Sequence, residues 1–407
     1  MIRSRKYLLL APLVTMMLGA LSILLVIAIV SSPELTFQAS LQGLSLWWHI
    51  IFPALLPFLV LSEMLIAYGW AHGMGVLLEP LMRRVFGLPG ASGWPLVMGL
   101  TTGYPGGAQA TMQLVEQGEL SHSEAEKSAV LSHFCNPMTV IVVIGIGLIG
   151  HPIAGYWLLG IHWLSGIIAF LTLTIFSRKE RSTTHKITIS QMSMNPPSRP
   201  SLIRRVITAM EQARIRDGRS FGKLLGEAVA HAVQTLMIVG GYIIIFAVII
   251  HIVSFFILPQ IPSYYVAGLF EMHLGTKALS SASSLSPIMK WSLLSALIGW
   301  SGLCALLQSI SLLKKTGKGW LTYTTVKLLH GGYAFVITLL VWRPLEQLNR
   351  DIQPTFMESS YVPWHSLDTP NLWSKIPLLL EWQGLILGCL LLVSLMIALF
   401  TSALRSR

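Results

Sequence analysis

The longest stretches of this sequence without a charged side chain decide what the chain can fold into. Residues 128–177 and 228–270 contain no Asp, Glu, Lys or Arg over 50 and 43 positions, and residues 7–30 and 382–404 contain none over 24 and 23. A helix that crosses the hydrocarbon core of a membrane needs about 20 such residues. Charged residues make up 11% of the chain, against about 25% in soluble domains. The sequence therefore predicts an all-α, polytopic transmembrane helical bundle and argues against a soluble enzyme or a disordered protein.

Most of the net charge of +11 lies in one segment. Residues 178–223 contain 11 Lys and Arg against 3 Asp and Glu. Loops on the cytoplasmic side of a membrane are enriched in Lys and Arg, so we interpret this segment as a basic cytoplasmic linker. Binding of lipid headgroups or of a partner is the alternative. We expect no nucleic-acid partner, because the rest of the chain is nearly neutral.

The linker and the uncharged stretches divide the chain into six parts. The first apolar run follows Arg3, Arg5 and Lys6 and lacks a small-residue cleavage site. It also exceeds the roughly 7–15 residues of a signal-peptide core, so we expect an uncleaved helix. The predicted parts are an N-terminal transmembrane helix at 1–33, a first membrane repeat at 40–177, the linker at 178–223, a second membrane repeat at 224–342, an extracytoplasmic loop at 343–381 and a C-terminal transmembrane helix at 382–407.

The apolar segment 94–114 cannot form one regular helix. Its centre, residues 99–109, contains four glycines and one proline in eleven positions, and both residue types weaken or break helices. We predict two half-helices with an unwound centre, in a segment that re-enters rather than crosses the membrane. The spacing of Ser121 and Glu124 predicts a capping box that opens the next helix, and Asn136-Pro137 predicts a second break.

The two halves of the sequence come into partial register at an offset of 199 residues. At this offset Thr102-Gly103 aligns with Ser301-Gly302, and Gln109 aligns with Gln308. The expected directions of the helices make the halves inverted repeats, an arrangement that many secondary transporters share. Whether segment 291–313 crosses the membrane or re-enters is left open.

The broken segments are the candidate substrate site. Unwound backbone at membrane depth is tolerated where it is buried in protein or lines a wet cavity, and the N-terminus of a half-helix favours an anionic or polar group. A kink that serves only helix packing is the alternative. The predicted substrate-binding residues are Thr101, Thr102, Gly103, Tyr104, Pro105, Gly106, Gln109, Asn136, Glu271, Ser301, Gly302 and Gln308.

Two further residues are candidates for binding a coupling ion. Glu63 lies in an otherwise uncharged apolar run, and an ionisable residue inside a membrane is costly and often functional. His133 lies beside the break at Asn136 and belongs to the residue type that titrates near neutral pH. Contact of Glu63 with water at the membrane surface and a structural role for His133 are the alternatives.

The sequence shows no pattern of a metal, cofactor or enzymatic site. The three cysteines, at positions 135, 304 and 389, lie far apart without CxxC spacing, and His231 and His251 lack ligand spacing. The GxSxG motif of a nucleophile elbow is also missing. We therefore expect no metal, no cofactor and no enzymatic activity.

Several of these motifs together resemble the YlbJ family of sporulation integral membrane proteins, over about residues 40–342. The stretches that carry the resemblance are Met98-Gly-Leu-Thr-Thr-Gly-Tyr-Pro-Gly-Gly-Ala-Gln109, Phe134-Cys-Asn136-Pro, Gly145-x-Gly147, Gly155-Tyr-Trp and Gly268-Leu-Phe-Glu271. The resemblance implies a Gate-type, nucleoside-recognition repeat in each half. In this chain Gln109 stands where the resemblance leads us to expect a lysine, so one positive charge is missing near the candidate site.

The resemblance also implies a function. It implies transport of dipicolinate, a small aromatic anion, across the mother-cell-derived outer forespore membrane during endospore formation. A transporter for nucleoside-type solutes and a non-transporting assembly protein of the spore envelope are the alternatives. The expected partners are a small-molecule solute and the lipid bilayer, and a homo-oligomer is left open.

Overall fold

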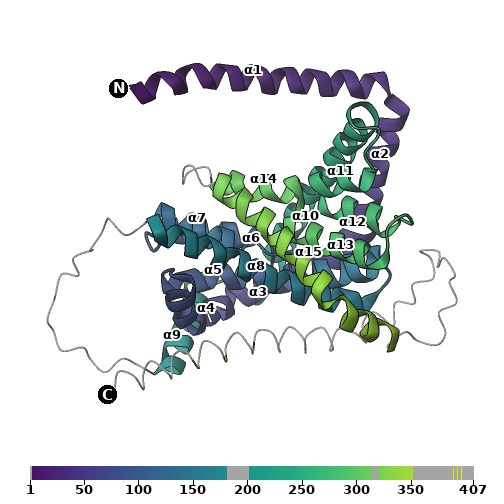
Figure 1. Ribbon diagram of the computed structural model, residues 1–407. Coiled ribbons are helices and arrows are strands. Elements are labelled where there is room, and N and C mark those ends of the chain that lie inside the picture. The colour runs from purple at the N-terminus through teal and green to yellow at the C-terminus, as the bar shows by residue number, and fades with distance from the viewer. Residues whose placement is uncertain are drawn as a thin grey trace.

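The computed structural model describes residues 2–180, 201–313 and 320–351, together with the single positions 388, 392 and 396. These residues form helices joined by turns, and no strand occurs among them (Figure 1). Helices satisfy their backbone hydrogen bonds internally, as a hydrocarbon environment requires. The predicted all-α fold is confirmed. Three predicted parts lie wholly or mostly outside the described residues: the C-terminal helix at 382–407, the loop at 343–381 and residues 181–200 of the linker.

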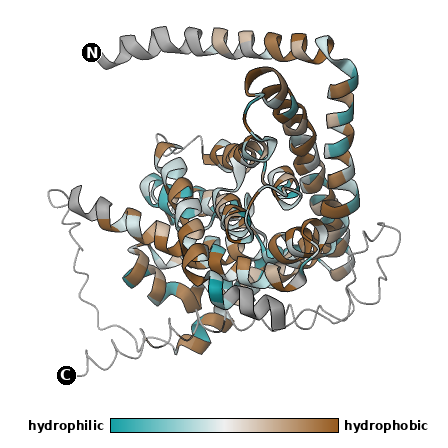
Figure 2. Ribbon diagram, turned by 45° about the vertical axis from the view of Figure 1, so that its right-hand side comes forward, coloured by the Kyte–Doolittle hydropathy of each residue, from teal (hydrophilic) through white to brown (hydrophobic). Residues whose placement is uncertain are grey.

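Five helical segments are long and apolar enough to cross a membrane. They are Pro33–Ala67, Ile153–Ile175, Phe221–Ile257, Pro287–Leu312 and Trp320–Pro344. Hydrophobic residues dominate their ribbons in Figure 2, including outward-facing parts. Such surfaces suit contact with lipid, so the chain is an integral membrane protein. The expected first helix is present as α1 (Ile2–Ser31), which extends away from the other helices (Figure 1).

Two long helical rods pack side by side. One consists of α2 (Pro33–Leu46), the π-helical turn η1 (Trp47–Ile51) and α3 (Phe52–Ala67). The other consists of α10 (Phe221–Ile252) and the π-helical turn η5 (Val253–Ile257). Trp47 joins them, because its Nε1 donates to the carbonyl of Leu236 at 2.8 Å and its ring lies against Gly240. A side chain at Gly240 would overlap the indole, so this close approach requires a glycine.

Two sets of helices follow the rods in the chain and have the same order of elements. Each set contains a helix pair joined by a tight turn, then a broken helix, then a long helix. The first set is α5 (Gly93–Thr101) and α6 (Gly106–Glu116), α7 (His122–Leu131) and the π-helical η4 (Met138–Leu148), and α8 (Pro152–Glu180). The second set is α11 (Ser263–Phe270) and α12 (Met272–Ser280), α13 (Pro287–Trp300) and α14 (Gly302–Leu312), and α15 (Trp320–Asp351).

The structure confirms the predicted breaks but corrects the register of the repeat. Helix α6 begins at residue 106 and α12 at 272, an offset of 166, and η4 begins at 138 and α14 at 302, an offset of 164. The predicted offset of 199 is wrong, because it aligned the turn of a helix pair with the break of a broken helix. Both contain a glycine in the left-handed region, with φ of +79° at Gly103 and +82° at Gly302. The local sequences therefore look alike although the elements differ.

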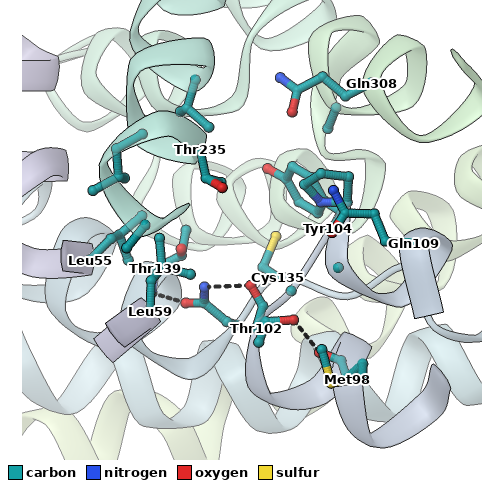
Figure 3. A pocket seen from close by; sticks show the side chains of 18 of the residues that line it. Leu55, Leu59, Met98, Thr102, Tyr104, Gln109, Cys135, Thr139, Thr235 and Gln308 are labelled. Atoms are coloured by element: carbon teal, nitrogen blue, oxygen red, sulfur yellow. Dashed lines mark hydrogen bonds between the residues drawn. The ribbon is translucent and has the colours of Figure 1, made fainter. Parts of the chain in front are cut away.

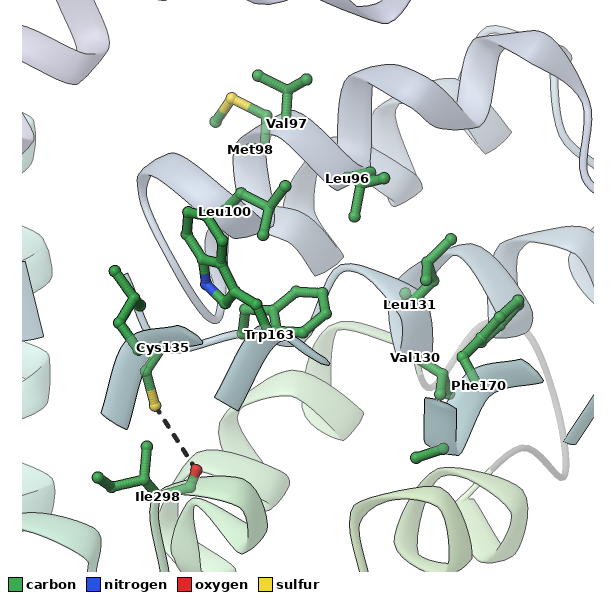
Figure 4. Close-up of a cluster of buried hydrophobic side chains, with 14 of the residues drawn as sticks. Leu96, Val97, Met98, Leu100, Val130, Leu131, Cys135, Trp163, Phe170 and Ile298 are labelled. Carbon is green, nitrogen blue, oxygen red and sulfur yellow. Dashed lines mark hydrogen bonds between the residues drawn. The ribbon is translucent and has the colours of Figure 1, made fainter. Parts of the chain in front are cut away.

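A buried apolar cluster holds the first set together. Figure 4 shows Leu96 and Leu100 of α5, Leu131 of α7 and Trp163 of α8 gathered around the segment that follows α7. The predicted capping box opens α7, with the Ser121 and Glu124 side chains each bonded to the other's backbone N–H. The segment 132–137 is thus fixed on the apolar side by the core, and its other side faces the candidate site.

The second part of the predicted linker is a helix. Residues 202–217 form α9 (Leu202–Asp217), with Ser201 as N-cap and Gly218 ending it in the left-handed region. Helix α9 packs against α4 (Trp70–Leu81), where Gly69 and Gly73 leave room for Met210. This helix was not predicted, because the charge of the segment gives no sign of a helix, whereas the caps at Ser201 and Gly218 do.

An ion pair fastens α9 to α4. Glu79 on α4 pairs with Arg205 on α9 and with Arg83 at 3.0 Å. Burial raises the pKa of Glu79, but the hydrogen bonds from Arg205 and Arg83 outweigh this, so its pKa lies below the usual value. The pair therefore contributes to the docking of α9 at neutral pH.

Candidate functional site

One cavity lies where the two sets of elements meet the rods. Figure 3 shows Thr235 and Gln308 on one wall and Thr102 and Thr139 on the opposite one. Its volume is about 130 Å³ for the centres of water-sized spheres. One water needs about 10–15 Å³ on that measure, so the cavity offers roughly ten water-sized positions. A small single-ring solute fits this space.

Four helices begin at the cavity. They are the second arms of both helix pairs, α6 and α12, and the second arms of both broken helices, η4 and α14. Asn136 caps η4, accepting from the backbone N–H of Thr139 at 2.7 Å, and Glu271 caps α12, accepting from the N–H of Leu274 at 2.7 Å. Helices α6 and α14 have no side-chain cap. Each N-terminus carries a partial positive charge, so four such charges converge on one volume.

Hydrogen bonds tie the first turn of the site to the first break. The amide of Asn136 donates to the carbonyl of Thr102 at 3.1 Å, and the N–H of Tyr104 donates to the carbonyl of Phe134 at 3.0 Å. Gly103 lies between them: its φ of +79° disfavours any other residue, and an added Cβ would come within 3.0 Å of the backbone nitrogen of Asn136. The turn and the break therefore form one rigid unit.

The second turn is tied to the second break in the same way. Gly302 lies against the backbone of residues 270–272, where a Cβ would come within 2.9 Å of the Phe270 carbonyl. Trp300 Nε1 donates to the carbonyl of Leu269 at 3.0 Å. Glu271, 3% exposed, lies in this turn and accepts from His273 Nδ1 at 2.8 Å. Each half thus contributes one turn, one break and one capping side chain.

Glu63 lies at the open end of the cavity. Its carboxylate is 3.6 Å from Arg219 and 3.6 Å from His231, and the side chains of Glu63 and His231 are 29% and 62% exposed. Cys135 and Asn136, at the other end, are buried. The cavity therefore opens between α3 and α10, next to the end of α9.

The structure gathers ten of the fourteen predicted residues around this cavity. They are Glu63, Thr102, Gly103, Tyr104, Pro105, Gly106, Gln109, Asn136, Glu271 and Gln308.

The other four predicted residues do not line the cavity. Thr101 donates to the carbonyl of Val97 within its own helix, and Ser301 donates to that of Ile298. Gly302 supports the second turn from behind. The ring of His133 stacks on Tyr104 at 4.7 Å between centroids, on the side away from the cavity. These residues shape the site without facing the space.

Several residues of the cavity wall were not predicted from the sequence. Those with polar or sulfur-containing side chains are Met98, Cys135, Thr139, His231, Thr235, His273 and Cys304. Met98, Cys135 and Thr139 lie within three residues of a predicted break, so the sequence offered a signal for them. His231 and Thr235 offered none, because they lie on α10, which is regular there.

The charged side chains of the cavity wall are acidic, although the sequence predicts an anionic solute. Glu63 and Glu271 contribute two carboxylates, and no Lys or Arg lines the cavity in the described part of the chain. Both carboxylates have basic partners: Glu63 has Arg219 and His231, and Glu271 has His273. Any positive potential in the cavity therefore comes from helix N-termini and imidazoles and not from a fixed cation on the wall.

Comparison with known proteins identifies related sequences. The Gate family model, described as nucleoside recognition, matches residues 48–152, which include the first helix pair and the first broken helix. The chain is 33% identical over 349 residues to the sporulation integral membrane protein YlbJ of Bacillus subtilis (strain 168), a match that covers 81% of this chain and 83% of that protein. No solved structure matches.

Proposed function

The chain belongs to the YlbJ family of sporulation integral membrane proteins, and from this we propose that it transports a small solute through the cavity between its two sets of elements. The observation that supports the proposal best is the convergence of four helix N-termini on one cavity. Broken helices of this kind build the solute sites of many secondary transporters. A scaffold protein has no need of unwound backbone at membrane depth, which costs hydrogen bonds.

The proposed solute is dipicolinate, carried across the mother-cell-derived outer forespore membrane during endospore formation. The uncapped N-termini of α6 and α14 suit carboxylate groups, and each such contact contributes about 0.3–1 kcal/mol, or up to about 2 kcal/mol when buried. The ring of Tyr104 offers an aromatic face at the cavity wall. The space suits a single-ring molecule.

A nucleoside-type solute is the second candidate. The family model is described as nucleoside recognition, and the wall carries the amides of Gln109, Asn136 and Gln308. An amide both donates and accepts hydrogen bonds, as recognition of a base edge requires. A nucleoside is larger than dipicolinate, so it would fill more of the cavity.

Uptake into proteoliposomes distinguishes the candidates. Purified protein is reconstituted, and labelled dipicolinate and labelled uridine are offered in parallel. We expect dipicolinate uptake that falls in Gln109→Leu, which loses an amide from the wall. Gln113→Leu is the matched control, since Gln113 lies on the same helix, is exposed and does not line the cavity. The proposal involves no covalent step, so the solute should be recovered unchanged.

Each result of the uptake assay favours a different function. Uridine uptake alone would keep the transport function and reject dipicolinate. Uptake of neither solute by protein shown to be folded would overturn the proposal in favour of an assembly role in the spore envelope. Equal loss of uptake in both glutamine variants would separate Gln109 from the solute site.

A further inference from the structure

Behind the cavity lies a cluster of basic groups that the proposed solute site does not use. Lys327, 1% exposed, lies on α15 inside the apolar segment Trp320–Pro344. Its Nζ is 3.1 Å from His330 Nδ1 and 3.3 Å from the carbonyl of His133. Among the described residues no carboxylate pairs with it. An ionisable residue inside a membrane span is expensive to bury and commonly functional.

The hydrogen bonds locate one shared proton. His330 Nε2 lies 2.8 Å from the carbonyl of His162, and a carbonyl only accepts, so Nε2 carries a hydrogen. The other ring nitrogen, Nδ1, faces Lys327 Nζ. A single excess proton can therefore lie between them, as an ammonium donating to an imidazole or as an imidazolium donating to an amine. A second excess proton would place two positive charges in contact in a buried site.

The titratable groups around Lys327 come from the elements packed against it. His133 and Cys135 come from the segment between α7 and η4, and His162 comes from α8. The ring of His162 stacks on that of His330 at 4.6 Å, and its Nε2 accepts from the N–H of Cys135 at 3.0 Å. Tyr323, on the same helix as Lys327, bonds to His133 at 2.6 Å. None of these groups is an acid that carries a negative charge at neutral pH.

The same short segment also forms the wall of the cavity. Cys135 lines the cavity, while its backbone N–H binds His162. His133 stacks on Tyr104 of the wall, while its carbonyl accepts from Lys327. The excess charge of the cluster is therefore separated from a bound solute by one layer of protein, and no water-filled space is needed between them.

We propose that Lys327 and His330 form a proton-binding site that takes up a proton when an anionic solute enters the cavity and releases it when the solute leaves. This inference rests on the proposed transport function. A negative charge in the cavity compensates a positive charge behind it, and by linkage the proton then favours the anion to the same extent. The proton comes from water on the side where the solute enters, adds to the Lys327–His330 pair, and returns to water on the side where the solute leaves, so no covalent bond between heavy atoms changes. The anion and the proton then move in the same direction.

Transport against a pH gradient tests the proposal. Proteoliposomes are held at zero membrane potential with the outer buffer one pH unit more acidic, and accumulation of labelled dipicolinate is followed. For one proton per solute, we expect wild-type protein to accumulate the solute about tenfold. Lys327→Met and His330→Gln should equilibrate the solute without accumulating it. Solute counterflow without a pH gradient, in the same vesicles, shows that each variant is folded.

Thr338→Val is the matched control. Thr338 lies buried on the same helix and bonds to Ser295 at 2.7 Å, away from the cluster, so this variant should accumulate the solute as wild type does. Tenfold accumulation by Lys327→Met or by His330→Gln would overturn the proposal. So would wild-type transport that ignores the pH gradient, although the transport function would then stand. No transport by folded wild-type protein would instead refute the proposed function, and the coupling with it.

Discussion

Gly302→Ala is the most direct perturbation of the candidate site, because it adds one methyl group at the contact between the second break and the second turn. Gly302 has a φ of +82°, and the new Cβ would meet three backbone atoms of residues 270–272 at 2.9–3.1 Å. Backbone atoms cannot rotate away as a side chain can. The variant therefore has to move the turn that carries Glu271.

The cost follows from two effects. An L-residue in the left-handed region costs about 1–2 kcal/mol. Overpacking costs about 1–3 kcal/mol, since the turn must move by about 0.5 Å to restore an ordinary contact of 3.4 Å from 2.9 Å. We expect a total of about 2–5 kcal/mol, shared between lower stability and a displaced turn. Solute binding should weaken at least tenfold, or about 1.4 kcal/mol.

The assay compares melting temperature and solute binding in detergent. Heat unfolding of membrane proteins is commonly irreversible, so all variants are scanned at one rate. Gly241→Ala is the control, because Gly241 lies within α10 and a Cβ there meets no atom within 4 Å. That variant should bind as wild type does and gain up to about 1 kcal/mol from helix propensity. Wild-type binding and melting by Gly302→Ala would refute the reasoning, since no strain would then act on the turn.

Three further predictions concern the elements that support the site. Glu79→Gln should weaken the docking of α9 by about 0.5–1 kcal/mol; because the pKa of Glu79 is lowered in the folded protein through Arg205, this contribution exists at neutral pH and is lost as the pH falls through the folded pKa. Hydrogen exchange in α9 should therefore differ between wild type and variant at pH 7, and this difference should shrink as the pH falls below the usual pKa range of a glutamate. Gly275→Ala should separate α11 from α12, because its Cβ would overlap the backbone of Gly268, and site-directed crosslinking across the pair should fail. Ser121→Ala should cost about 1 kcal/mol through loss of the capping box, seen as faster exchange in the first turn of α7 only.

The sequence was sufficient to predict where the chain breaks. Glycine and proline at 99–109 and the Asn136-Pro137 pair have local effects on backbone geometry, and local effects can be read without knowing the fold. The structure confirms a break at 102–105 and one at 132–137. Ten of the predicted residues meet at one cavity because breaks at membrane depth face inward, where unwound backbone finds partners.

The pairing of the halves was not predictable in the same way. A match of Thr102-Gly103 to Ser301-Gly302 compares glycines that share a φ value but belong to different elements. Telling a helix pair from a broken helix requires long-range contacts, such as Gly268 against Gly275, that leave no periodic signal. Cavity-wall residues on regular helices, such as Thr235, were not predicted for the same reason: only long-range contacts identify them.

Lys327 was not predicted as a functional residue, although the sequence contains the feature that indicates one. It interrupts an apolar run of the sequence in the way that Glu63 does, and the same argument from the cost of burial applies to both. The structure separates the two: Glu63 is 29% exposed at the open end of the cavity, while Lys327 is 1% exposed. Burial therefore favours a functional role for Lys327 more strongly than for Glu63.

The glutamine at position 109 and the lysine at position 327 bear on one requirement of a carrier. A fixed cation on the cavity wall would hold an anion equally well before and after the conformational change, and tight binding that does not vary opposes release. Helix N-termini give weaker attraction, and a charge that Lys327 and His330 can gain and lose gives attraction that varies with the transport cycle. On our proposals, Gln109→Lys should therefore strengthen dipicolinate binding and slow its release. Faster uptake by this variant at saturating solute would show that release is not the slow step and that a fixed charge serves this chain as well as a switchable one.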